Sequence, residues 1–359
     1  MPCAETAPPR GSGSGLEGWS SGLGRLGMII ALVLIMTGCT TDRPIETEES
    51  PVGFTNPVYG SNFPDPLILT GPDGRPARDG KYWAYATNGN GANVQTLTST
   101  DLVTWEQGPD ALPNLPEWST PGKVWAPEVI QHPDGRYLMY YTTRAPDPEI
   151  QCVGLAVADA PGGPFVDDHD GPLICETDQG GSIDAHPYVD RDGNRYLYWK
   201  NDGNHIGVDS YISVQRLDES GTELVDAPRR LFKQDQPWEG PLVEGPFVWE
   251  RDGTYYMFYS GNGFASPDYA VGIATADNPL GPFTKQPEPI LVGNDVAAGP
   301  GHNAIFAKDG RVWMVYHGWA PDAVGESIPG RMMWLSEVTF GDDGTVTVEP
   351  PRTDYPVRP

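Results

Sequence analysis

Five copies of one pattern recur along this chain: an acidic or polar residue, an apolar run, a Gly-centred turn and an aromatic-rich strand. The turns lie at Gly80, Gly135, Gly193, Gly253 and Gly310. Their spacing of roughly 55 to 60 residues is typical of one four-stranded propeller blade with a long loop. Because a single blade cannot bury its apolar faces, the copies must stack around a common axis. The pattern predicts an all-β fold, a single five-bladed β-propeller over residues 56–359, with the residues that open each repeat meeting at the axis.

Composition agrees with many short strands and limits the partners. The chain has 44 Gly and 38 Pro, with 11 Trp and 16 Tyr, and it contains no long stretch of clear helical periodicity. Its formal net charge of −26 disfavours binding to nucleic acid phosphates or to an anionic membrane surface.

The segment before the repeats resembles an export signal. An apolar run from Met28 to Met36 follows Arg25 and ends at Thr37-Gly38-Cys39, and it is too short to favour a membrane span. Residues 1–39 are therefore interpreted as a leader with a bacterial lipoprotein-like signal peptide, in which Cys39 becomes the lipidated first residue; plain secretion is the alternative. Residues 40–55 are predicted to form a disordered tether. The expected location is extracellular, as a cell-surface lipoprotein that meets the membrane only through its N-terminal lipid anchor.

Two cysteines remain in the predicted domain, Cys152 and Cys175. An exported protein can form a disulfide between them, and two buried thiols are the alternative. The sequence contains no CxxC motif or Cys/His cluster, which disfavours a zinc site.

The residues that open the repeats carry the chemistry. Four of the openers contain an acid and one contains a histidine, in the order Asp65, Glu128, Asp184, Glu244 and His302. Neighbouring carboxylates repel, so one of them retains its proton near neutral pH. One protonated acid facing one ionised base is the equipment for hydrolysis of a glycosidic bond, and this chemistry requires no cofactor.

These ordered motifs resemble glycoside hydrolase family 43, the five-bladed propellers that cleave arabinans, xylans and their side chains with inversion. The resemblance implies that Asp65 is the catalytic base, Glu244 the general acid, and Asp184 the auxiliary acid that tunes Glu244. It implies that Arg331 reaches the terminal sugar. His302 matches an axial histidine that lies near a bound calcium or other ion in arabinan-degrading members, so a structural calcium ion is an expectation here.

Some assignments have local rivals. Glu239 stands in a Trp-Glu-Gly-Pro phrase similar to that of Glu244, but Glu244 directly precedes a predicted strand, so Glu239 is expected on the preceding loop, solvated or at the pocket rim. Glu128 is expected either to contact substrate or to hydrogen-bond the loop backbone. His186 is expected to pack or cap.

Aromatic residues near the openers are candidates for stacking on a sugar ring. Phe63, Trp83 and Trp125 lie in such positions, and Phe63 and Trp125 are predicted to bind substrate. Mid-strand tryptophans such as Trp199 and Trp313 are expected to pack between blades.

The predicted function is an inverting exo-acting α-L-arabinofuranosidase that releases arabinose from plant polysaccharide or oligosaccharide. Endo-arabinanase and β-xylosidase are alternatives within the same family. The retaining sucrose- and fructan-cleaving propellers are disfavoured, because Ile183 and Ala185 flank Asp184 where those proteins have an Arg-Asp-Pro motif. A non-catalytic glycan-binding surface propeller is the rival from another class.

Overall fold

The structure is a computed structural model that describes residues 53–71 and 74–359. The predicted leader, the lipoprotein signal and most of the predicted tether lie outside the described residues.

Four-stranded sheets make up four of the five repeats, and the remaining repeat has three strands. Blade 1 consists of β2 (Leu67–Leu69), β3 (Tyr82–Ala86), β4 (Gln95–Ser99) and β5 (Glu106–Gln107). Blade 2 consists of β6 (Thr120–Gln131), β7 (Tyr137–Pro146) and β8 (Glu149–Ala158). Blade 3 consists of β9 (Ser182–Val189), β10 (Arg195–Asn201), β11 (Tyr211–Leu217) and β12 (Leu224–Lys233). Blade 4 consists of β13 (Val243–Arg251), β14 (Thr254–Gly261), β15 (Ala270–Ala276) and β16 (Thr284–Lys285). Blade 5 consists of β17 (Ala298–Lys308), β18 (Arg311–Trp319), β19 (Met332–Phe340) and β20 (Val346–Val348).

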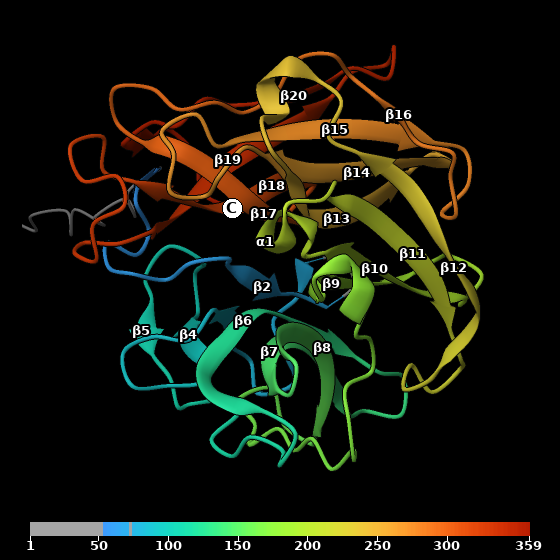
Figure 1. Cartoon of the computed structure of the whole chain (residues 1–359). Coiled ribbons are helices and arrows are strands. Elements are labelled where there is room, and N and C mark those ends of the chain that lie inside the picture. Colours follow the sequence, from blue (N-terminus) through green and yellow to red (C-terminus); the bar gives the residue numbers. More distant parts are fainter. Residues whose placement is uncertain (1–52, 72–73) are drawn as a thin grey trace, which may run out of the picture. The chain divides into compact units, whose positions relative to one another are not determined.

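The first strands of the blades form a closed ring. Contacts run from β2 to β6, β9, β13 and β17, and β17 contacts β2 again. Figure 1 shows the five sheets arranged around this centre. The predicted five-bladed β-propeller is therefore confirmed, and the openers of the repeats lie on or just before the innermost strands.

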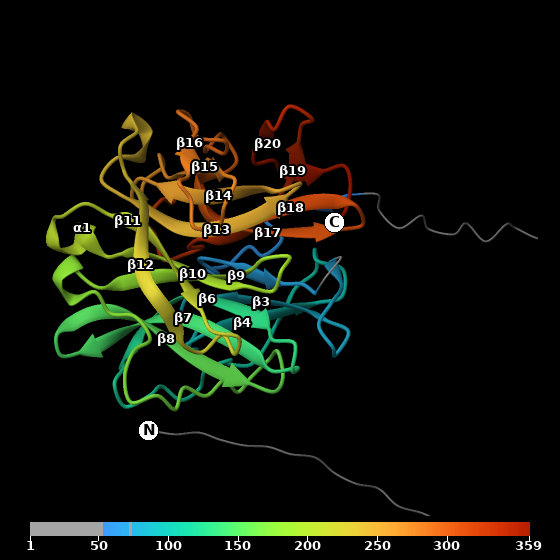
Figure 2. The same ribbon diagram turned by 90° about the vertical axis from the view of Figure 1, so that its right-hand side faces the viewer.

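A short helix, α1 (Gly203–Ile206), follows β10. It lies near the centre of the ring in Figure 1 and at one face of it in Figure 2. The loop after the second strand of blade 3 therefore stands over the axial end of the propeller.

The two ends of the described chain meet on blade 5. Strand β1 (Phe54–Thr55) pairs with β21 (Asp354–Tyr355), and Tyr59 forms a bridge with Met333 of β19. Asn56 is 2% exposed and joins the two ends through hydrogen bonds with Leu335 and Arg352. Strand β1, which begins two residues before the expected boundary at residue 56, thus pairs with the end of the chain.

Blade 2 is completed by an irregular outer segment in place of a fourth strand. Val166 and Ile174 bridge to Val157 and Val153 of β8. A disulfide between Cys152 and Cys175 fastens the same segment to β8, which decides between the two states expected for these cysteines.

Large aromatic side chains fill the spaces inside and between the blades. Trp199 is 1% exposed, and Trp313 is fully buried, as expected for packing residues. Within the part of the chain that the structure describes, no helix is long and apolar enough to cross a membrane.

Candidate active site

One backbone position recurs at the axial start of every blade. At this position, which we call the axial position, the residue has a left-handed φ between 41° and 57°; the five residues are Asp65, Ala126, Asp184, Gly245 and His302. Non-glycine residues rarely adopt positive φ, and Asp does so more readily than bulky residues. In blades 2 to 5 the strand register shifts near this position, as a β-bulge does when it redirects a side chain. The repeated bulge therefore explains how Asp65, Asp184 and His302 are presented toward the axis.

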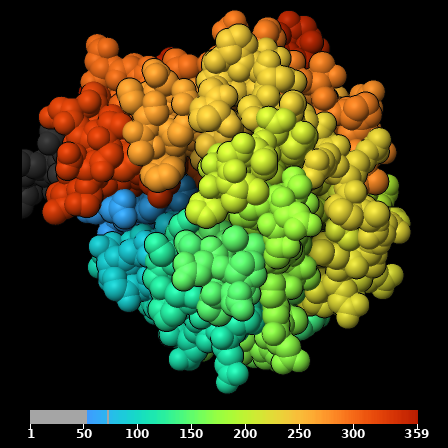
Figure 3. Space-filling model, viewed as in Figure 1, coloured from blue at the N-terminus to red at the C-terminus, as the bar shows by residue number. Residues whose placement is uncertain are grey.

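A cavity of about 690 Å³ lies at the axial end of the ring, and its lining includes Asp65, Asp184 and Glu244. Each of these residues is less than 10% exposed. The wall is completed by α1 and by the loop of residues 263–266. Figure 3 views this face, where the surface is hollowed between the yellow-green surface of α1 and the orange surface of blades 4 and 5. The three carboxyl groups, which lie far apart in sequence, thus share one cavity.

Asp65 is surrounded by cationic and hydroxyl groups. Its Oδ1 atom lies 2.6 Å from Arg331 Nη1 and 3.4 Å from His302 Nδ1, and Thr87 donates a hydrogen bond to its Oδ2 atom. Burial opposes ionisation, but the charges of Arg331 and His302 outweigh it and hold the pKa of Asp65 well below its usual value. Asp65 is therefore an ionised carboxylate throughout the neutral range, as a water-activating base must be.

Glu244 has different partners. Its Oε1 atom accepts a hydrogen bond of 2.8 Å from the Tyr269 hydroxyl. Its Oε2 atom lies 3.4 Å from Lys200 Nζ, which is also 3.4 Å from Asp202 Oδ1. Burial would lower the pKa of Lys200, but the neighbouring carboxylates Glu244 and Asp202 raise it. Lys200 is therefore a buried ammonium shared between two acids.

Asp184 connects the two other carboxyl groups. Its Oδ2 atom accepts a hydrogen bond of 3.1 Å from the backbone N–H of Gly245, next to Glu244. Burial is the largest cause that raises the pKa of Asp184 to about 6; His302 opposes the rise, and the charge of Glu244 adds to it. Asp184 therefore retains a proton in mildly acidic solution, next to the carboxyl group of Glu244.

Of the three residues predicted to bind substrate, two line the cavity and one does not. Trp125 and Arg331 line the cavity with the carboxyl groups. Phe63 does not: it is 1% exposed and packs edge-on against Tyr59, with ring centroids 5.8 Å apart. The expected stacking role of Phe63 is corrected, because its ring is covered by the segment that closes the propeller. Phe264, which is 47% exposed, is an aromatic of the cavity lining, and the Arg331 guanidinium lies 4.7 Å from its ring centroid.

Glu239 lies outside the cavity lining and is fully buried, so the expectation of a solvated or rim position is wrong. It accepts hydrogen bonds from Tyr259, from Lys285 Nζ and from the backbone of Asp235 and Gln236. These hydrogen bonds occupy the lone pairs of the Glu239 carboxylate, so the role of Glu239 is structural.

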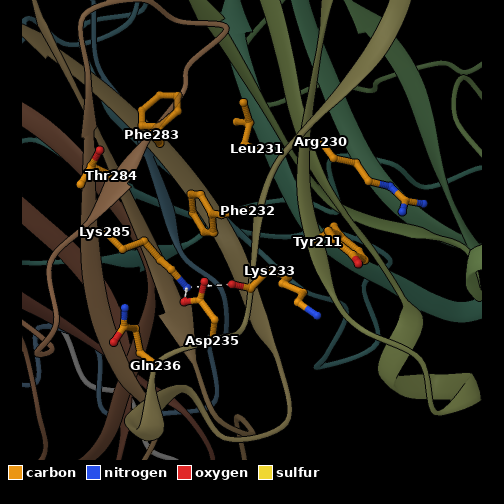
Figure 4. A pocket seen from close by; sticks show the side chains of 10 residues that line it. All are labelled: Tyr211, Arg230, Leu231, Phe232, Lys233, Asp235, Gln236, Phe283, Thr284 and Lys285. Carbon is orange, nitrogen blue, oxygen red and sulfur yellow. Dashed lines mark hydrogen bonds and ion pairs between the residues drawn. The ribbon is translucent and has the colours of Figure 1, made fainter.

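A second cavity, of about 630 Å³, lies beside this network, between the outer strands β12 and β16. Figure 4 shows Lys285 in it, bound to Asp235 and to the carbonyl oxygen of Lys233. The Tyr211 ring in the same cavity is covered by the Arg230 guanidinium, 4.4 Å from its centroid. None of the predicted catalytic residues lines it.

Glu128 and His186 form a separate contact. Glu128 Oε2 lies 3.5 Å from His186 Nδ1, and the His186 ring packs on Phe247 with centroids 4.2 Å apart. Neither residue lines the axial cavity. Glu128 is therefore placed against a neighbouring blade, and His186 packs as expected.

The donor set around His302 was expected to allow an ion. His302 lines the cavity and faces Asp65, which is already paired with Arg331. Calcium prefers six to eight oxygen ligands. In residues 53–71 and 74–359, no group of three or more His, Cys, Asp or Glu side chains could hold a metal ion. The described side chains at His302 therefore supply no set of three such ligands, and the expected ion stays a prediction.

Sequence reasoning missed several residues of the site. Thr87, Lys200 and His317 come from the second strands of their blades or just after them, and Tyr269 directly precedes β15. One signal was present for Lys200: a lysine directly follows the aromatic run Tyr196-Leu-Tyr-Trp199 of a buried strand, and a buried lysine requires a partner. The others carry no local motif.

Comparison with known proteins agrees with this architecture. The family model described as Glycosyl hydrolases family 43 matches residues 54–346. The β-D-galactofuranosidase xynD of Aspergillus niger is 32% identical over 283 residues, which cover 73% of this chain and 75% of that protein. An extracellular endo-α-(1→5)-L-arabinanase of Bacillus subtilis is 25% identical over 300 residues, covering 64% of this chain and 62% of that protein. The crystal structure of a thermostable family-43 glycoside hydrolase superposes with a TM-score of 0.74 at 34% identity, over 84% of this chain and 97% of that one.

The propeller and its carboxyl-lined axial cavity, together with these relatives, define a glycoside hydrolase. More narrowly, the chain belongs to glycosyl hydrolases family 43.

Proposed function

We propose that this protein is an inverting, exo-acting α-L-arabinofuranosidase that releases arabinose from arabinan or from arabinose-substituted plant polysaccharide. The observation that carries the proposal is that one cavity holds carboxyl groups in two different environments: an ionised Asp65 paired with Arg331, and Asp184 with a raised pKa beside Glu244.

In this mechanism Asp65 accepts a proton from a water molecule as the water oxygen forms a bond to the anomeric carbon. Glu244 gives its proton to the glycosidic oxygen, which leaves with the electron pair of the broken carbon–oxygen bond. The configuration at the anomeric carbon inverts. Asp184 is assigned the auxiliary role of tuning Glu244, because it accepts the N–H of the adjacent Gly245 and its own raised pKa reflects the interaction of the two carboxyl groups.

The rest of the cavity suits a short sugar end. Arg331 lies on the side of Asp65, where it can bind hydroxyl groups of the terminal ring. Trp125 and Phe264 offer apolar faces for the C–H surface of a furanose. The volume of about 690 Å³ is in the range of sites for small ligands.

The test is a panel of aryl α-L-arabinofuranosides, aryl β-xylosides, linear arabinan and arabinoxylan, with product anomers followed by proton NMR from the first minutes. The proposal expects arabinofuranosides to be the preferred substrates and the first product to have the opposite anomeric configuration. Initial release of the same anomer overturns inversion, and preference for xylosides selects the β-xylosidase alternative. Shortening of arabinan from within selects endo-arabinanase.

Glu244→Gln and Asp65→Asn separate an enzyme from a glycan-binding propeller. Both variants are expected to lose turnover by orders of magnitude while sugar binding is largely kept. If the wild type and both variants behave identically toward every glycoside of the panel, the glycan-binding propeller is supported instead.

A second activity is favoured by one comparison, the 32% identity with a β-D-galactofuranosidase. Both substrates are furanosides, and they differ in the length of the chain outside the ring. Paired 4-nitrophenyl α-L-arabinofuranoside and β-D-galactofuranoside, assayed under the same conditions, decide between them by the ratio of kcat/KM values.

We also propose that the protein is exported and anchored by lipid at Cys39. The B. subtilis relative is described as extracellular, and the disulfide between Cys152 and Cys175 suits an oxidising compartment. Mass spectrometry of the membrane fraction tests the anchor: an acylated N-terminal Cys39 supports it, and a soluble, unmodified product in the medium refutes it.

A further inference from the structure

A ring of hydrogen bonds links the axial positions of successive blades. In four cases the backbone N–H of the axial residue donates to a side chain on or just after the second strand of the preceding blade. The donor and acceptor pairs are Asp65 with His317 Nδ1 (3.3 Å), Ala126 with Thr87 Oγ1 (2.9 Å), Asp184 with Thr142 Oγ1 (3.1 Å) and His302 with Ser260 Oγ (2.8 Å). These bonds fix each bulge against its neighbour.

The accepting side chains occupy one equivalent position of the second strands, which we call the cross-strand position. In blades 2, 4 and 5 this residue pairs with the residue directly before the axial one: Thr142 with Trp125, Ser260 with Glu244 and His317 with Gly301. In blade 1 the N–H of Thr87 bonds to the carbonyl oxygen of Pro64, which also directly precedes the axial residue.

Blade 3 breaks this pattern. Its cross-strand residue, paired with Ile183, is Lys200. An ammonium has no acceptor, so Gly245 N–H turns instead to the Asp184 carboxylate of blade 3. The lysine side chain is 1% exposed, and burial of an unpaired charge is costly. A threonine or serine suffices in the corresponding position of three other blades, so the fold alone does not call for a lysine here.

We propose that Lys200 is a positioning residue for the general acid: it stabilises the negative charge that develops on Glu244 as the proton leaves, and Asp202 is its counter-ion in the resting site. This inference rests on the proposed function. The geometry supports it, because Lys200 Nζ lies 3.4 Å from both Glu244 Oε2 and Asp202 Oδ1. As charge grows on Glu244, the ammonium can shift its hydrogen bond from Asp202 to Glu244 without moving through the cavity.

The charged groups that face Glu244 come from several strands. Asp184 lies on β9, His302 on β17, and the Tyr269 hydroxyl donates to the other carboxyl oxygen. Asp65 and Arg331 are paired with each other on the opposite side of the site. Among the described residues, Lys200 is thus the cation that hydrogen-bonds to Glu244.

The test uses Lys200→Thr, which installs the residue that blades 1 and 2 carry in the equivalent position and can accept the Gly245 N–H. Asp202→Asn is the second variant, because it removes the counter-ion. Lys285→Met is the matched control: Lys285 is 5% exposed and is also shared by two carboxyl groups, Asp235 and Glu239, but it lies outside the axial cavity. Each protein is assayed with aryl furanosides of good and poor leaving groups across pH.

Lys200→Thr is expected to lower kcat/KM for a poor leaving group about 10- to 100-fold, as loss of a charge-assisted hydrogen bond predicts. A dinitrophenyl leaving group needs little protonation, so kcat/KM for such a substrate is expected to fall less than about threefold. The alkaline limb of the pH profile is expected to move up by about one pH unit in Lys200→Thr and down in Asp202→Asn. Lys285→Met is expected to lower Tm and leave the limb in place.

An equal loss for both leaving groups with an unmoved alkaline limb would overturn the inference and assign Lys200 to structure. A shift of the same sign in Lys200→Thr and Asp202→Asn would overturn it as well. Should wild-type protein fail to hydrolyse any furanoside or xyloside of the panel, the proposed function itself fails, which is a different outcome from an active wild type with insensitive variants.

Discussion

Separate substitution of Glu239, just before blade 4, and of Glu244, in its first strand, distinguishes a structural glutamate from the general acid. Glu239 and Glu244 stand in similar phrases, but Glu239 is fully buried under five donated hydrogen bonds, whereas Glu244 lines the cavity. Glu239→Gln places an amide where Lys285 donates twice, at 2.7 and 2.9 Å. Lys285 keeps Asp235 at 2.6 Å, so part of the pairing survives.

The expected cost of Glu239→Gln is about 3 kcal/mol, the lower end for breaking a buried ion pair. For a domain of about 300 residues this corresponds to a fall in Tm of roughly 5 °C. Below the transition, kcat is expected to stay within about threefold of wild type, because the residue has no contact with the cavity.

Glu244→Gln has the opposite signature. The side chain is 11% exposed and keeps a partner in Tyr269, so Tm is expected to change by less than about 3 °C. Turnover of a substrate with a poor leaving group is expected to fall by about 10³-fold, because the catalytic proton is lost. Differential scanning calorimetry and initial rates on the same preparations measure both quantities. Loss of turnover in Glu239→Gln at unchanged Tm, with an active Glu244→Gln, would refute the assignment of the acid.

Three further predictions concern stability. The pKa of Asp184 is about 6 in the folded protein and 3.8 in the unfolded reference, so ionisation of this group lowers the stability of the fold as pH rises through that window. Asp184→Asn is therefore expected to raise the free energy of unfolding by up to about 3 kcal/mol relative to wild type at pH 7.5 but by little at pH 4. Urea unfolding at both pH values measures this, and equal effects at the two would contradict it. Reduction of the Cys152–Cys175 disulfide, which closes a separation of 23 residues, is expected to cost about 3 kcal/mol, seen as a lower Tm with dithiothreitol that Cys152→Ser reproduces without reductant. Asn56→Ala removes three hydrogen bonds where the chain ends meet and is expected to cost about 2 to 4 kcal/mol; a Tm within 1 °C of wild type would show that the ring closes without them.

The repeats predicted the ring because a blade is a local unit whose period is visible in sequence. Asp65 and Asp184 were found because each opens a repeat at the bulged axial position, and Glu244 because it directly precedes that position. Phe63 was misplaced because its burial depends on the segment that closes the ring at blade 5.

Partnerships between distant strands were also out of reach. Glu239 is satisfied by Lys285, 46 residues later at the outer edge of blade 4, and Lys200 of blade 3 by Glu244 of blade 4, 44 residues later. Neither pair shares a strand, so no local sequence pattern encodes it. Lys200 became interpretable only when the register showed which residues of the other blades occupy its position.

The axial position has a consequence for how such a protein can be altered. Its backbone geometry is already adopted by Asp, Ala, Gly and His in one molecule, so the scaffold tolerates different occupants at the rim of the hub while the sheets behind it stay the same. Ala126 holds this geometry with no functional group, and an aspartate there would add a carboxylate to blade 2 at little conformational expense. At these five positions a single substitution can change the chemical groups at the hub while the fold stays the same.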